Sequence, residues 1–284
     1  MQHFSRWLIA ALVVLGLGGI GYLWWQKQQA AAPAPITAMP PLAQAPVVAA
    51  PEPVASAPAN FPVEAIAPLA QASAPLPPLV DDPDVVRAAL IALLGRQDVL
   101  SFLDVNDFAR RFVATVDNLA RGHTASRLWP VVPAPARFLV VERDGAIFMA
   151  NGNTDRYNAF VRFATAVDTG AAVALYVRMY PMLQKAYEDL GYPGKYFNNR
   201  MVEVIDLLLR TPEPGEPIRL SFTEVKGPIE VKRPWVRYEF ADPDLEARPA
   251  GQKILMRMGT KNARPLKAKL GELRKRIAGR AVGG

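Results

Sequence analysis

The spacing of hydrophobic and polar positions divides the chain into three regions. Residues 7–25 form an apolar run of 19 residues without a charged side chain, about the length of a helix that crosses a hydrocarbon core. Residues 26–80 follow neither a helical nor a strand period. From residue 81 onward, apolar positions recur every three to four residues or alternate, as in folded helices and strands. We therefore expect a short tail at 1–6, a membrane helix, a linker and one globular domain at 81–284.

The apolar run contains GLGGIG at residues 16–21, which matches the G-x-G-x-x-G pattern of dinucleotide-binding turns. Such a turn needs a preceding strand and an acidic residue about 20 positions further on, but the first carboxylate in the chain is Glu52. Trp7 at the start of the run, with Trp24 and Trp25 at its end, matches the aromatic belts of membrane interfaces. We interpret the glycines as part of a membrane helix and predict no nucleotide site.

A cleavable signal peptide is the alternative interpretation of this run, because Ala30–Ala32 offer an A-x-A cleavage site. The run is longer than the apolar region of a signal peptide, which has about 7 to 15 residues, so we expect an uncleaved anchor. Arg6 and the N-terminal amine precede the run and Lys27 follows it. The positive-inside rule then favours, by a small margin, a cytoplasmic N-terminus and a periplasmic domain in the bacterial inner membrane.

The linker, residues 26–80, is dominated by small and rigid residues. Its 55 positions hold 13 prolines, 17 alanines and three charged side chains. Frequent proline removes backbone donors, and such a composition buries too little apolar surface to offset the entropy of ordering. The sequence therefore predicts a disordered Pro/Ala-rich spacer.

Helical periods account for most of the domain. The first helix is expected to start at Asp82 and Pro83, a capping residue followed by one suited to the first helical position, and to end at Gly95. A second helix is expected from about Asp104 to Ala120. Further helices are expected at 155–168, at 170–190 with a kink at Pro181, at 197–210 and at 265–278.

Two segments change to the period of strands. Residues 138–150 predict a hairpin, because Asp144 and Gly145 suit a two-residue turn that needs positive φ. The stretches IRLSFTEV (218–225) and WVRYEF (235–240) alternate with period two and predict a second strand pair. The expected fold class is a predominantly helical α+β domain with a small antiparallel β component.

The domain offers few residues for catalysis. It has no cysteine, which excludes a thiol nucleophile. Its single histidine, His123, leaves a metal site short of ligands. We predict a non-enzymatic protein with no catalytic, cofactor-binding or metal site. Glu203 and Asp206 lie one helical turn apart and keep a cell-wall hydrolase with paired carboxylates as an alternative. A solvated face of opposite charges is the simpler interpretation of this pair.

Tyrosines recur on one face of the helix expected at 170–190 and in the turn that follows it. Tyrosine combines apolar area with a polar tip, so such a set can line a groove for a peptide or a glycan. Packing in the core is the alternative, and it is the commoner use of aromatic side chains at helical spacing. The candidate recognition residues in this part of the chain are Tyr180, Tyr187, Tyr192, Tyr196 and Arg200.

The net charge of +7 comes from the last part of the chain. Residues 81–260 hold 23 basic and 23 acidic side chains, whereas 261–284 hold eight basic side chains and one acidic side chain. The helix expected at 265–278 also carries an apolar stripe of Leu266, Leu270, Leu273 and Ile277. We expect the stripe to dock this helix onto the domain. The alternative is contact with an anionic partner such as lipid headgroups, nucleic acid or an acidic polymer.

The basic residues beside the stripe are expected to stay in solvent, where they are available to a partner: Arg274, Lys275, Arg276 and Arg280.

Several long segments resemble one bacterial family. They are RRFVATVDNLARG, MYPMLQKAYEDLGYPGKYFNNRMVEVIDLLLRTPE, YEFADPDLE and GQKILMRMGTKNARPLKAKLGELRKRI, in this order. Together they are similar to the domain-of-unknown-function family numbered 3014, found mainly in proteobacteria. The resemblance implies a membrane helix and a Pro/Ala linker ahead of the domain. That family has no established activity, so no site residue is carried over.

From these features we expect a single-pass inner-membrane protein whose envelope-facing domain binds or scaffolds another envelope protein or polymer. Its contact with the membrane would be through residues 7–25. No small-molecule cofactor is expected, and a nucleic-acid partner is not favoured. The alternatives are a cell-wall hydrolase, and binding of nucleic acid or anionic lipid through the basic C-terminal helix.

Overall fold

The computed structural model describes residues 60–66, 78–215, 217–222 and 238–279. All of these residues belong to one unit of the chain, Val54–Gly284. The membrane helix predicted at 7–25 lies outside the described residues.

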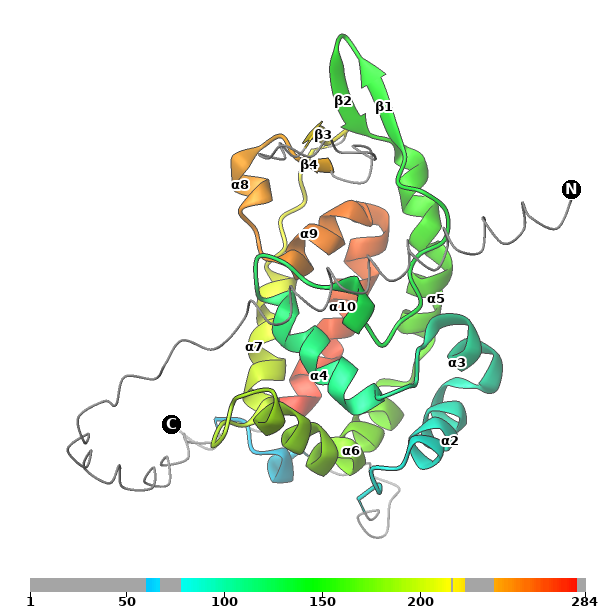
Figure 1. Cartoon of the computed structure of the whole chain (residues 1–284), viewed down its shortest axis with the longest axis vertical. Helices are drawn as coiled ribbons and strands as arrows, with labels where there is room; N and C mark the ends of the chain where they lie inside the picture. Colours follow the sequence, from blue (N-terminus) through cyan, green and yellow to red (C-terminus); the bar gives the residue numbers. More distant parts are fainter. Residues whose placement is uncertain (1–59, 67–77, 216, 223–237, 280–284) are drawn as a thin grey trace, which may run out of the picture. The chain divides into compact units, whose positions relative to one another are not determined.

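The described residues are mostly helical, as expected (Figure 1). The α-helices are α2 (Pro83–Leu94), α3 (Arg96–Phe102), α4 (Phe108–Leu119), α5 (Asn158–Ala166), α6 (Thr169–Asp189), α7 (Phe197–Leu209), α8 (Pro243–Glu246), α9 (Ala250–Arg257) and α10 (Thr260–Ile277). Short 3-10 helices lie at η1 (Val63–Ala65), η2 (Ser126–Leu128) and η3 (Asn151–Tyr157).

The first helix begins as predicted. The carboxylate of Asp82 accepts hydrogen bonds from the backbone N–H groups of Asp84 and Val85, and Pro83 occupies the first helical position. Gly95 ends α2 with φ 85°, but α3 follows directly at Arg96, where the sequence predicted no helix.

The second predicted helix starts later than expected, at Phe108. Asp104 accepts a hydrogen bond from the backbone N–H of Asn106, which favours a turn over a helix. Asp107 then adopts a left-handed conformation with φ 48°. Helix α4 therefore begins only after this turn.

Two prolines lie inside helices. Pro181 lies in α6, which continues to Asp189. Pro265 was predicted to open the last helix, but α10 starts five residues earlier, at Thr260. The buried Asn262 stabilises this first turn, because its side-chain amide donates hydrogen bonds to the carbonyls of Thr154 (2.7 Å) and Met258 (3.3 Å). These contacts offset the backbone hydrogen bond that proline removes.

The two predicted strand pairs join into a single antiparallel sheet with the order β1-β2-β3-β4. The strands are β1 (Val140–Arg143), β2 (Ala146–Met149), β3 (Arg219–Phe222) and β4 (Tyr238–Phe240). Asp144 and Gly145 have φ 50° and 73°, which confirms the predicted hairpin turn. The pairing of β2 with β3, through Ile147 opposite Leu220, links the two hairpins.

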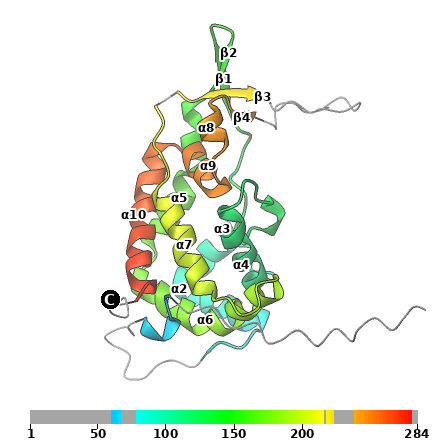
Figure 2. The same cartoon turned by 90° about the vertical axis from the view of Figure 1, so that its left-hand side faces the viewer.

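The helices share one main core. Helices α4, α6 and α7 provide its most buried side chains, among them Val113, Leu183 and Phe197. Helix α10 packs along α7 and α5 (Figure 2). A separate apolar cluster forms between the sheet and the two short helices α8 and α9. The expected fold class, a predominantly helical α+β domain, is confirmed for the described residues.

The folded part of the chain begins before residue 81. Residues 60–66 lie within the predicted spacer, yet they form η1 and bury Ile66 against α6, α7 and α10. Leu79 also contacts the domain, since its backbone N–H donates to the carbonyl of Arg178 at 2.9 Å.

One glycine is required by close packing between helices. A Cβ at Gly251 of α9 would lie 2.6 Å from Cδ2 of Leu208 and 3.0 Å from the carbonyl oxygen of Leu119. Replacing Gly251 by alanine is therefore expected to lower the free energy of unfolding by about 1–3 kcal/mol, the usual cost of overpacking. Denaturant unfolding of the purified protein would measure the change.

Gly271 provides the matched control, because a Cβ there meets no atom within 4 Å and the residue also lies in a helix. Gly271→Ala should leave stability unchanged or raise it by up to about 1 kcal/mol. Equal effects of the two substitutions would contradict the packing argument.

Candidate functional site

Two of the predicted recognition residues meet at a buried carboxylate. Asp117 of α4 is 2% exposed. Its Oδ2 accepts hydrogen bonds from Arg121 Nη2 (2.6 Å) and from the Tyr192 hydroxyl (3.2 Å). Its Oδ1 accepts from Arg200 Nε at 3.0 Å. Tyr192 and Arg200 therefore tie α4 to α7 and to the turn after α6.

Tyr187 lies in the core beneath this network. Its ring stacks on that of Tyr192, with centroids 4.5 Å apart. Burial raises the pKa of Tyr187 to about 12, because the phenolate form would lose its hydration. Tyr187 is therefore a core residue and not part of an exposed recognition surface.

Tyr180 lies near Glu64 of the segment 60–66, and Tyr196 lies near Tyr180 at the residue before α7. The pKa of Tyr180 is raised to about 12, mainly by burial and to a smaller extent by the neighbouring Glu64 and Tyr196. The Tyr180 hydroxyl donates to Gln184 Oε1 at 3.0 Å, and the same oxygen accepts from the backbone N–H of Phe197 at 2.8 Å. These contacts fix the start of α7 against α6.

The predicted basic surface of the last helix is only partly available. Arg274 is partly solvated, with 37% of its side chain exposed, because its Nη2 binds Asp206 Oδ2 of α7 at 3.0 Å and its Nε binds the other carboxylate oxygen. Lys275 and Arg276 are exposed. The apolar stripe of α10 packs on the domain beside Arg274, with Ile277 buried.

The Arg274–Asp206 pair predicts a pH-dependent contribution to stability. The hydrogen bond from Arg274 lowers the pKa of Asp206 from its ordinary value. An aspartate whose pKa is lower in the folded than in the unfolded state stabilises the fold at pH values above its unfolded pKa. This stabilisation is lost as the pH falls through the pKa of the folded state. The unfolded pKa of aspartate is about 3.9. In the Arg274→Gln variant, the free energy of unfolding should therefore decrease less than in the wild type as the pH falls below about 4.

Denaturant unfolding at a series of pH values from neutral to acidic would measure this effect, with Arg276→Gln as the control. Arg276 is an exposed neighbour on the same helix turn and the weakest of the groups that lower the pKa of Glu272, so its replacement should change the profile much less. Identical profiles of Arg274→Gln and the wild type would contradict the assignment.

The candidate carboxylate pair is also held by arginines. Asp206 binds Arg274, and Glu203 lies 3.4 Å from Arg200 Nη1. A general acid for glycoside cleavage needs a raised pKa, whereas the pKa of Asp206 is lowered.

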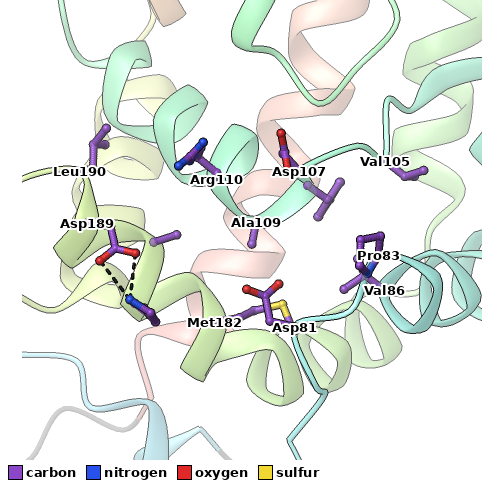
Figure 3. Close-up of a pocket in the computed structure, with 13 residues that line it drawn as sticks. Asp81, Pro83, Val86, Val105, Asp107, Ala109, Arg110, Met182, Asp189 and Leu190 are labelled. Atoms are coloured by element: carbon purple, nitrogen blue, oxygen red, sulfur yellow. Dashed lines mark hydrogen bonds and ion pairs between the residues drawn. The ribbon is translucent and has the colours of Figure 1, made fainter.

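A pocket that the sequence did not indicate lies between α2, α4 and α6 (Figure 3). Its volume is about 420 Å³, which falls in the usual range for ligand sites of roughly 300–1,000 Å³. Val86, Ala109 and Met182, one from each helix, are buried and form an apolar floor. These residues are distant in sequence, and no motif connects them.

Charged side chains surround the pocket. Lys185 pairs with Asp189 along α6 at 3.0 Å. In Figure 3, dashed lines mark the interaction at the labelled Asp189. Asp81, Asp107 and Arg110 are exposed at the rim. With three aspartates against one lysine and one arginine, the lining carries an excess of one negative charge. The site thus combines an apolar floor with a mildly acidic rim.

The fold and the pocket define the class: an α-rich α+β domain with a ligand-sized pocket. The model of a family described as a protein of unknown function, DUF3014, matches residues 108–274. This match spans more than half of the chain, and the chain belongs to the DUF3014 family. The matched region includes Asp117, Arg200 and the α4 and α6 walls of the pocket. No curated protein and no solved structure matches the chain.

Within the described ranges, no single helix has the length and apolar character needed to span a membrane. The segments Asn151–Ala166 and Thr169–Asp189 meet that criterion only as a pair, bent by 81°. The same ranges contain no group of three or more histidine or acidic side chains placed to hold a metal ion.

Proposed function

We propose that this chain is a single-pass inner-membrane protein whose periplasmic domain binds another envelope component without catalysing a reaction. The anchor is residues 7–25, and the binding site is the pocket between α2, α4 and α6. The pocket is the observation that supports the proposal, because apolar clefts with a few polar groups are the usual form of binding sites.

The chemistry of the pocket suggests what enters it. The buried side chains of Val86, Ala109 and Met182 favour an apolar group. The exposed carboxylates of Asp81 and Asp107 favour a basic group beside it. The partner we propose is a protein segment that inserts an apolar side chain and carries a lysine or arginine next to it.

The hydrolase alternative has weaker support. Asp206 is paired with Arg274 and Glu203 with Arg200, so both candidate carboxylates stabilise contacts between structural elements. Neither residue lines the α2–α4–α6 pocket.

Filling the pocket is expected to abolish capture of the partner. Ala186 lines the pocket on α6 and is partly buried, so the indole of Ala186→Trp would occupy the apolar floor. Cells expressing tagged full-length chain would be converted to spheroplasts and treated with a membrane-impermeant amine crosslinker. We expect one specific adduct with the wild type and at least a tenfold loss, about 1.4 kcal/mol of binding energy, with Ala186→Trp.

Ala159→Trp is the matched control, since Ala159 is exposed on α5 and a tryptophan there adds the same side chain elsewhere. It should leave the adduct at the wild-type level. An unchanged adduct in Ala186→Trp would reject the pocket as the site. If the reagent fails to modify the domain itself in intact spheroplasts, the periplasmic orientation is wrong.

A further inference from the structure

Residues 60–66 form a short segment that packs between α6, α7 and α10 of the domain. We refer to this segment as the arm and to its seat between α6, α7 and α10 as the arm groove. The arm contributes Ile66, which is 7% exposed, to an apolar cluster with Val173, Val202 and Ile277. Phe61 and Val63 pack against the same cluster. The contacts join the arm to residues more than 100 positions further along the chain.

Two consecutive asparagines clamp the backbone of the arm. The backbone N–H of Phe61 donates to Asn199 Oδ1 at 3.0 Å, and the carbonyl of Phe61 accepts from Asn198 Nδ2 at 2.8 Å. Both main-chain groups of one residue are therefore bound by adjacent side chains at the start of α7. This clamp binds main-chain atoms of the arm, and it leaves sequence selection to the apolar cluster.

Asn198 is fully buried and serves three elements. Besides the arm, its Nδ2 donates to the carbonyl of Ile277 at the end of α10 at 3.0 Å, and its Oδ1 accepts from the Tyr176 hydroxyl of α6 at 3.0 Å. Without the arm, one donor of this buried amide would lose its partner, which is costly. The groove is thus built to hold a peptide.

The covalent connection between the arm and α2 is long. Eleven residues, 67–77, separate Ile66 from Pro78, and a chain of this length spans at most about 40 Å. The arm can therefore reach a groove on a neighbouring molecule as well as its own.

We propose that the arm exchanges between two copies of this chain, so that each copy places residues 60–66 in the arm groove of the other. A second copy is the occupant that we propose, because its arm would reproduce every hydrogen bond and apolar contact seen within one chain. Reciprocal exchange also closes a two-fold dimer without a new interface.

Concentration controls this exchange. By its length alone, a connection of eleven residues corresponds to an effective concentration of about 1 mM of the arm for its own groove. Exchange therefore competes with binding of the arm to its own groove when the local concentration of the chain is also about 1 mM. At micromolar concentrations the arm stays in its own groove.

The chain has no cysteine, which allows a direct test by disulfide trapping. A Cβ at Gly279 would lie 3.3 Å from the Cβ of Ala65, close to the separation of about 3.8 Å in a disulfide. Full-length Ala65→Cys and Gly279→Cys chains with different tags would be purified in detergent, mixed and oxidised. A disulfide between the two chains requires the arm of one copy to occupy the groove of the other.

We expect the mixed disulfide dimer at about 1 mM total chain and little of it at about 1 μM. A mixture of Ala65→Cys with Glu142→Cys, a cysteine on the exposed end of β1, measures random collisions. A single chain that carries both Ala65→Cys and Gly279→Cys should form an internal disulfide at low concentration. Gly279 has φ 65°, and the strain of a cysteine there is the same in both arrangements.

Ile66→Ala provides a readout that general destabilisation would not give. On the chain with Ala65→Cys it weakens the donor arm and should reduce the mixed dimer about tenfold or more. On the chain with Gly279→Cys it weakens the competing internal arm and should increase the mixed dimer. The same substitution thus acts in opposite directions on the two partners.

A mixed dimer no more abundant than the collision control at 1 mM would overturn exchange, and the arm would then act only within its own chain. Equal reductions by Ile66→Ala on both chains would also overturn it. If the doubly substituted chain forms no internal disulfide, the arm does not occupy the groove at all. None of these outcomes depends on the α2–α4–α6 pocket or on the membrane orientation.

Discussion

Replacing Asp117 by alanine is expected to lower the free energy of unfolding by about 3–5 kcal/mol, the usual effect of removing one partner of a buried ion pair. The Asp117 carboxylate is 2% exposed and binds Arg121, Arg200 and Tyr192. Its removal leaves the guanidinium of Arg200, which is 23% exposed, without its main counter-charge. Denaturant unfolding of the purified domain would measure the loss.

Asp189 supplies the control for this experiment. It also pairs with a basic residue, Lys185, but the two side chains are 61% and 72% exposed. Exposed pairs contribute about 0–1 kcal/mol, so Asp189→Ala should have little effect. If both aspartates prove equally dispensable, the network around Asp117 does not hold α4 to α7.

Replacing Leu270 by alanine is expected to lower the free energy of unfolding by about 2–3 kcal/mol, the lower part of the range for Leu→Ala in cores. Leu270 packs against both the main core and the cluster that holds Ile66. Part of its side chain remains accessible, which limits the loss. Thermal and denaturant unfolding would both report it.

The basic side chains beside it should behave differently. Lys275 and Arg276 are exposed, so the Lys275→Gln, Arg276→Gln variant should change stability by no more than about 0.5 kcal/mol. Co-sedimentation with anionic vesicles tests the alternative role of this helix. A harmless Leu270→Ala together with lost vesicle binding would mean that the stripe faces a membrane and not the core.

The sequence by itself determined the local elements whose signals are short-range. Asp82 and Pro83 start α2, and Asp144 with Gly145 turns the hairpin, because capping and positive φ depend on the residues at those positions. The apolar stripe of α10 also predicted its docking, since helical spacing places those side chains on one face. The motifs shared with DUF3014 lie within the region that the family model matches, except that the last one continues three residues past it, to Ile277.

The tertiary structure decided the elements whose stability comes from distant contacts. Helix α10 continues through Pro265 because Asn262 binds a carbonyl 108 positions earlier in the chain. Residues 60–66 are ordered because Asn198 and Asn199 bind Phe61 at a separation of more than 130 positions. Composition alone indicated a spacer there, since proline and alanine content carries no information about such partners.

For the candidate sites too, the sequence indicated the residue types, and the tertiary structure decided which side chains are buried. Tyrosines at helical spacing indicated a recognition surface, but whether each one faces solvent depends on which helices cover it, and Tyr187 lies in the core. The pocket of Val86, Ala109 and Met182 depends on how α2 and α4 lie against α6. Capping, turn and amphipathic signals act over a few residues and are readable from the chain, whereas burial and ion pairing arise only when distant segments meet.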